Sequence, residues 1–167
     1  MPKTSATIND LLDLAIALEN ATDAFYRGLA VLFAHEVEVE RFWRHYADAE
    51  AGHARWIENL RAQMDESKLR QPTDAGMVEA ARTLLKTSPE SQLEKISDLE
   101  EAYRAAIEIE NSETNSIFEF LITDFVLTSR SGDFLRTQLH SHVSELTKAF
   151  PSPFQSSLKR SNVKAKR

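Results

Sequence analysis

A glutamate and a histidine three residues apart are the first pair in this sequence that could do chemistry together. Glu50 and His53 lie in the stretch "YADAEAGHARWIENL" (46–60), whose aromatic and aliphatic residues recur at helical spacing. On an α-helix, side chains three positions apart are separated by about 60° and share one face. A carboxylate and an imidazole on one face could bind the same metal ion. Because a single Glu-x-x-His pair often arises by chance in an acidic helical chain, the interpretation depends on further ligands elsewhere.

An internal repeat indicates two further carboxylates. The segment "AIALEN" (15–20) recurs as "AIEIEN" (106–111), and four of the six positions are identical. The repeat puts Glu19 and Glu110 at equivalent places in two predicted helices. Burying an unpaired carboxylate costs several kcal/mol, so a bundle that turns Glu19, Glu50 and Glu110 inward needs cations beside them. Hard metal ions accept carboxylate oxygens, and imidazole suits iron, manganese or zinc.

Hydrophobic periodicity predicts four long helices that could position these residues. They are residues 7–34, 37–65, 98–127 and 134–149. A shorter helix at 76–86 lies in the connection between the second and third. Thr7-x-x-Asp10 and Ser97-x-x-Glu100 are predicted to form capping boxes at two of the helix starts. The predicted fold class is therefore all-α: a four-helix bundle of two antiparallel pairs, joined by a crossover that contains a short helix.

Composition limits the other possibilities. The chain has 167 residues, 42% of them hydrophobic, with only 4 Gly and 5 Pro, which is typical of one helical domain; we expect it to span 1–150. The last nine residues carry five basic side chains, and the tail 151–167 is expected to be disordered. A net charge of −6 does not favour nucleic-acid binding. The absence of cysteine, of a signal-peptide core and of a transmembrane run predicts a cytoplasmic protein.

Taken together, these residues resemble the site of ferritin-like di-iron proteins, close to the rubrerythrin group. That group carries a Glu on the first and third helices and a Glu-x-x-His on the second and fourth. The resemblance covers about residues 7–149, with His142 in the place of the last ligand. It implies that Glu50 bridges two metals, that Glu19 and His53 bind one, and that Glu110 and His142 bind the other. Two iron ions are then expected, with manganese or zinc as alternatives.

The sequence departs from that pattern in the fourth helix. The Glu expected three residues before His142 is replaced by Leu139, and if His140 were the ligand the position would be Thr137. Glu113, one turn after Glu110, is a candidate replacement. Otherwise water or hydroxide fills the position, or only one metal is held well.

The sequence also departs from the family pattern in its source of electrons. Classical rubrerythrins resemble this bundle with an added four-cysteine iron domain, and this sequence contains no cysteine. Any redox cycle would therefore need an external electron donor.

Three functions are consistent with these observations. The first is a di-iron oxidoreductase that acts with oxygen or peroxide, or a related role in iron handling. The second is a metal-binding bundle with an incomplete site and no turnover. The third is a metal-free interaction module that uses its basic tail.

Aromatic residues near the predicted ligands add two smaller predictions. Tyr26, Tyr46, Trp43 and Trp56 are interpreted as core residues, and Tyr46 is also a candidate hydrogen-bond partner of a ligand carboxylate. Phe118, Phe120 and Phe125 exceed what one core is expected to hold, which suggests a homodimer.

Overall fold

The structure is a computed structural model of the chain. It describes residues 6–87, 89–125, 133, 136–137, 141–142, 144–146 and 148–151, with only the backbone at 113–115. This part consists of helices and connecting loops, apart from one isolated β-bridge between Thr7 and Pro72. Residues 152–167, which make up almost all of the predicted basic tail, lie outside it.

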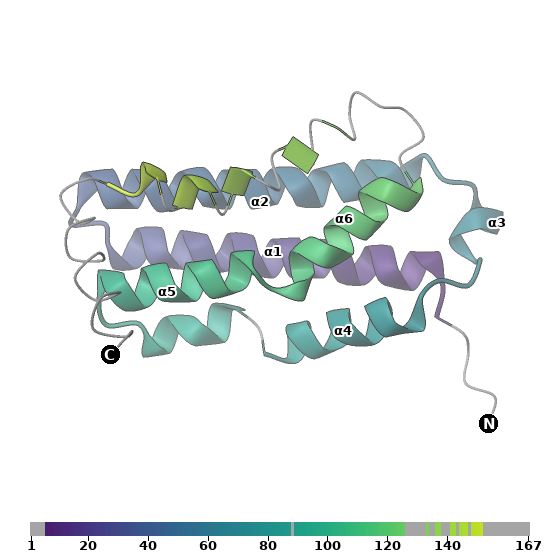
Figure 1. Ribbon diagram of the computed structural model, residues 1–167, viewed down its shortest axis with the longest axis horizontal. Coiled ribbons are helices and arrows are strands. Elements are labelled where there is room, and N and C mark those ends of the chain that lie inside the picture. Colours follow the sequence, from purple (N-terminus) through teal and green to yellow (C-terminus); the bar gives the residue numbers. More distant parts are fainter. Residues whose placement is uncertain are drawn as a thin grey trace.

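The first two helices form an antiparallel hairpin. α1 (Ile8–Leu32) and α2 (Val37–Ala62) run side by side along the length of the molecule (Figure 1). α1 begins at the predicted capping box: the Thr7 hydroxyl accepts a hydrogen bond from the Asp10 amide, and the Asp10 carboxylate accepts one from the Thr7 amide. The cap satisfies amide groups that the first turn of a helix leaves free, which fixes where α1 begins.

The crossover contains more structure than the sequence predicts. Besides the predicted short helix, observed as α4 (Ala75–Lys86), it holds α3 (Glu66–Leu69) and the 3-10 helix η1 (Pro89–Lys95). η1 packs closely on α1 because Gly28 has no side chain: a Cβ there would lie 2.3 Å from Leu93 Cδ1. Figure 1 shows α4 and η1 covering the outer side of α1 and α5.

The prediction of one continuous helix over 98–127 is wrong. The structure has α5 (Leu99–Glu110) and α6 (Glu113–Phe125), and α6 runs obliquely to α5 (Figure 1). Asn111 is the C-cap of α5, and its side-chain amide donates to the Ile107 carbonyl at 2.8 Å. The break therefore directly follows Glu110.

The predicted capping box at Ser97 is displaced by one residue. Asp98 is the N-cap of α5, and its carboxylate accepts from the Glu101 amide at 2.8 Å. The Glu101 carboxylate in turn accepts from the amide and hydroxyl of Ser97. The N-cap therefore lies one residue later than predicted, and the Glu101 carboxylate bonds back to Ser97, the residue before the N-cap.

The last predicted helix, 134–149, lies partly outside the described residues. The described residues between 133 and 149 are helical, and they lie along α2 (Figure 1). His142, Leu146 and Phe150 are buried there. The described residues therefore agree with the predicted arrangement, in which two helical pairs are joined by a crossover.

Two hydrophobic clusters occupy the two ends of the bundle. One contains Tyr26, Trp43 and Tyr46, together with residues of α5 and Phe150. The other contains the first half of α1 with Ile57 and residues of α4 and α6. Glu19, Glu50 and Glu110 lie along their helices between residues of the two clusters. The bundle therefore has a buried polar layer between two apolar ones.

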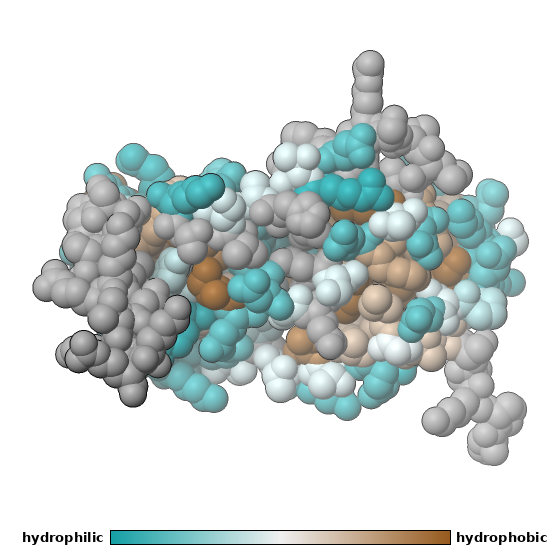
Figure 2. All heavy atoms as spheres, in the orientation of Figure 1, coloured by the Kyte–Doolittle hydropathy of each residue, from teal (hydrophilic) through white to brown (hydrophobic). Residues whose placement is uncertain are grey.

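The three phenylalanines on which the homodimer prediction rests are buried to different extents. Phe118 is 1% exposed, whereas Phe120 and Phe125 are partly buried and pack on the second cluster. Figure 2 shows hydrophobic side chains gathered between α6 and α4 on this face. The homodimer stays a prediction.

Within the described residues, no helix combines the length and the hydrophobicity needed to cross a bilayer.

Candidate metal centre

Five of the residues predicted from the sequence meet in the polar layer. They are Glu19 of α1, Glu50 and His53 of α2, Glu110 at the end of α5, and His142. Each is between 3% and 6% exposed. Charged side chains are rarely buried to this extent without partners of opposite charge.

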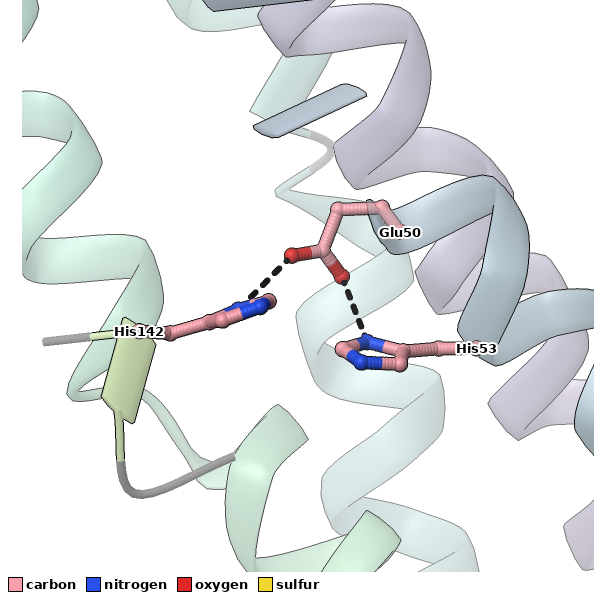
Figure 3. Close-up of side chains that lie close together, drawn as sticks. All are labelled: Glu50, His53 and His142. Carbon is pink, nitrogen blue, oxygen red and sulfur yellow. Dashed lines mark hydrogen bonds and ion pairs between the residues drawn. The ribbon is translucent and has the colours of Figure 1, made fainter. Parts of the chain in front are cut away.

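Glu50 lies at the middle of the group. Its Oε2 is 3.2 Å from Nδ1 of His53, and its Oε1 is 3.3 Å from Nδ1 of His142. Figure 3 shows the two carboxylate oxygens directed at the two imidazoles. These three residues offer ligand atoms that all lie within 4.8 Å of one another.

Each imidazole also faces a second carboxylate. His53 Nδ1 lies 3.5 Å from Glu19 Oε2, and His142 Nδ1 lies 3.5 Å from Glu110 Oε2. The centre therefore has two matching halves, Glu19 with His53 and Glu110 with His142, which share Glu50. The repeat that relates Glu19 to Glu110 in the sequence thus corresponds to a pseudo-twofold arrangement in space.

Two tyrosines hold the Glu110 half in place. The Tyr26 hydroxyl donates to Glu110 Oε1 at 2.6 Å, which leaves Oε2 facing His142. The Tyr46 hydroxyl donates to the backbone carbonyl of His142 at 3.0 Å. The prediction that Tyr46 contacts a ligand carboxylate is therefore wrong, and Tyr26, interpreted as a core residue, makes that contact. Its position seven residues after Glu19, two turns along the same face, is the available signal.

Aromatic rings enclose the other half. The Phe118 ring lies 4.9 Å from the His53 imidazole, and Trp56 packs edge-on against Phe118 at 5.4 Å. His53 Nε2 is buried and has no hydrogen-bond partner within the described part of the chain. This apolar wall keeps Nδ1 as the imidazole nitrogen that faces the carboxylates.

The carboxylates keep both imidazoles protonated in the absence of metal. Burial by itself lowers the pKa of His53, but Glu19 and Glu50 raise it to about 9. Burial likewise acts against the charged form of His142, and Glu110 and Glu50 raise its pKa to about 10. At neutral pH two imidazolium ions therefore supply the positive charge that the buried carboxylates need.

The pKa values of Glu50 and Glu19 shift in opposite directions. Burial acts to raise the pKa of Glu50, but its contacts with His142 and His53 outweigh burial and hold the pKa below its ordinary value. Burial raises the pKa of Glu19 to about 8, and the nearby Glu50 charge adds to this rise, although His53 opposes it. Glu50 is thus the carboxylate that stays an anion between the two imidazolium ions.

These donor atoms have the spacing that a metal ion requires. Two ligand atoms that each lie about 2.1 Å from one ion, at angles of about 90° to 109°, are about 3.0 to 3.4 Å apart. The observed separations from imidazole nitrogen to carboxylate oxygen are 3.2 to 3.5 Å. Carboxylate oxygens with imidazole nitrogens suit iron, manganese or zinc. The residues present therefore fit a metal centre.

The remaining candidates are not assembled in this way. Glu113 is the first residue of α6, beyond the break that follows Glu110, and its side chain lies outside the described part of the chain. Leu139 and His140 also lie outside the described residues. Thr137 is exposed, and its hydroxyl donates to the Asp133 carbonyl at 2.8 Å, so that position supplies no ligand.

Comparison with known protein families identifies the family of the chain. The model of the rubrerythrin family matches residues 10–124, which run from the first turn of α1 almost to the end of α6. No curated protein and no solved structure matches the chain. The match includes Glu19, Glu50, His53 and Glu110, whereas His142 follows the matched range. The predicted fold class, an all-α ferritin-like bundle, is confirmed.

Proposed function

The chain belongs to the rubrerythrin family, and from this premise we propose that it is a di-iron oxidoreductase that reacts with oxygen or peroxide. The observation that supports this most is the position of Glu50, whose two oxygens face two buried imidazoles, each beside a further carboxylate. A purely structural ion-pair network has no need of such a paired arrangement.

Each half of the centre would hold one ion. Glu19 and His53 would bind the first, Glu110 and His142 the second, and Glu50 would bridge them. Bound iron would supply one-electron redox chemistry toward oxygen or peroxide. Three carboxylates leave two divalent ions one negative charge short of neutrality, so a further anion is needed. Hydroxide or Glu113 could supply it, and Leu139 stands where the family pattern has a fourth carboxylate.

The surrounding residues orient the ligands and exclude water. Tyr26 fixes one oxygen of Glu110, and Tyr46 fixes the backbone at His142. The Phe118 and Trp56 rings shield His53. A site that excludes water strengthens the electrostatic attraction between the ligands and the metal ions, and it protects reactive species from water. Because the sequence contains no cysteine, electrons would come from an external donor.

Metal analysis of protein purified from an iron-fed culture tests this proposal. We expect close to two ions per chain, absorption of an oxidised iron centre after peroxide is added, and loss of both in Glu50→Gln. Glu58→Gln, an exposed change on the same helix, is the matched control. Wild-type protein with far less than one ion per chain would refute the proposal. Stoichiometric metal without any peroxide consumption would indicate a metal-binding bundle without turnover.

A further inference from the structure

The crossover leaves two hollows that share one wall. The outer one is a groove of about 550 Å³ between η1 and α5, and the inner one is a cavity of about 90 Å³. Thr87, Gln92 and Glu108 line both hollows, so the groove and the cavity adjoin each other. Thr87 directly follows α4, and Figure 1 shows α4 and η1 below α1 and α5.

The inner cavity reaches the helices that carry the ligands. Leu18 and Ile109 line it, and they directly precede Glu19 and Glu110 in the chain. Leu18 is 2% exposed and Ile109 is 8% exposed, so the cavity extends into the core. Ser112, in the break between α5 and α6, also lines it. The cavity thus lies between α1 and α5, beside the residues that directly precede Glu19 and Glu110.

The lining favours small uncharged molecules over metal ions. Leu18, Leu84, Pro89 and Ile109 make the inner cavity largely apolar. A hydrated dication would lose its water against such a wall at a cost of many kcal/mol. The groove outside carries Lys86, Lys95 and Arg104 against two carboxylates, which adds a repulsion for cations. A small oxidant without charge is not repelled by the basic groups, and its dehydration costs far less than that of a dication.

We propose that this cavity is the entrance through which a small uncharged oxidant, dioxygen or hydrogen peroxide, reaches the centre from the α1–α5 side. The inference rests on the proposed function, because it assigns a route to the reactant of that function. Leu18 and Ile109 line the inner end of this route, and changes of their rotamers would open it toward the centre.

A pair of matched substitutions at the end of α4 tests the route. Thr87 and Thr83 are both exposed threonines one turn apart, and only Thr87 lines the two hollows. We expect Thr87→Trp to slow oxidation of the ferrous-loaded protein by peroxide about tenfold, because entry then limits the rate. Thr83→Trp should leave the rate unchanged, and both variants should hold the same iron content as wild type. Glu108→Trp blocks the same passage from α5 if Thr87→Trp does not fold.

Xenon gives a readout that needs neither metal nor activity. In crystals of the metal-free protein under xenon pressure, we expect a xenon atom in the cavity beside Leu18 and Ile109, since apolar cavities bind xenon. Its absence, or an unchanged oxidation rate in Thr87→Trp and Glu108→Trp, would overturn the proposed route. If the wild-type ferrous protein is not oxidised at all, the proposed function fails, and the xenon result alone then decides whether the cavity admits small uncharged molecules.

Discussion

Replacing Tyr26 by phenylalanine removes one hydroxyl beside the centre and keeps the aromatic ring. The ring stacks on Trp43 with centroids 5.9 Å apart, and this packing does not involve the hydroxyl. The hydroxyl donates to Glu110 Oε1 at 2.6 Å. Burial and the charges of Glu110 and Glu50 raise the pKa of Tyr26 well above its ordinary value, so it stays a donor at every working pH.

The expected loss of metal affinity follows from the hydrogen bond between Tyr26 and Glu110. A hydrogen bond to a charged group contributes about 1.5 to 3 kcal/mol. Loss of a hydrogen bond that orients a metal ligand usually costs about 10- to 100-fold in metal affinity. We therefore expect Tyr26→Phe to weaken binding of one of the two ions, the one held by Glu110 and His142, by about that factor, because Glu110 belongs to one half only.

The affinity for each ion is measured by letting the protein compete with a chromophoric chelator for cobalt(II), an air-stable probe for both halves. Tyr103→Phe is the control, because Tyr103 is only partly buried and its ring packs on Phe150, away from the carboxylates. Binding of both ions by Tyr26→Phe with affinities within about twofold of wild type would refute the reasoning, since the hydroxyl would then not orient a ligand.

Three further predictions concern the bridge, the metal-free protein and the crossover. Glu50→Gln should lower the pKa of both His53 and His142 and remove bound metal from both halves; NMR titration of the imidazoles in metal-free protein checks the first effect. In chelator-treated protein the folded state binds more protons than the unfolded state between the ordinary His pKa of 6.5 and the raised values of about 9 and 10. The free energy of unfolding should therefore fall as the pH rises through this window, and a flat urea-denaturation profile from pH 7 to pH 10 would contradict the assignment. Gly28→Val should cost about 1 to 3 kcal/mol of stability by displacing Leu93. In a double-mutant cycle with Leu93→Ala the two losses should be less than additive, and full additivity would show that the contact is unimportant.

The sequence predicts which carboxylates and imidazoles meet in the core better than it predicts their surroundings, for physical reasons. Helical periodicity fixes which face of a helix a residue occupies, and this places Glu19, Glu50 and Glu110 inside. The repeat also pairs the first and third helices, because it puts Glu19 and Glu110 at equivalent positions. Which hydroxyl meets which carboxylate depends instead on how two helices are rotated against each other. For that reason the sequence pattern favours Tyr46 as the carboxylate partner, although Tyr26 makes the contact.

The break after Glu110 shows a second limit. Hydrophobic residues continue at helical spacing on both sides of it, at Ile109 and Ile117, so the pattern predicts one helix. Asn111 and Ser112 are the local signal for an end, because their side chains compete for backbone hydrogen bonds. Asn111 does so here by donating to the Ile107 carbonyl. Ser112, which lies in this interruption, lines the inner cavity.

Anomalous diffraction from crystals of the iron-loaded protein tests the central claim most directly. The account predicts two iron peaks on either side of the Glu50 carboxylate, one between Glu19 and His53 and the other between Glu110 and His142. Density without any anomalous peak in this layer, with His53 and His142 still paired to carboxylates as in the metal-free protein, would contradict it.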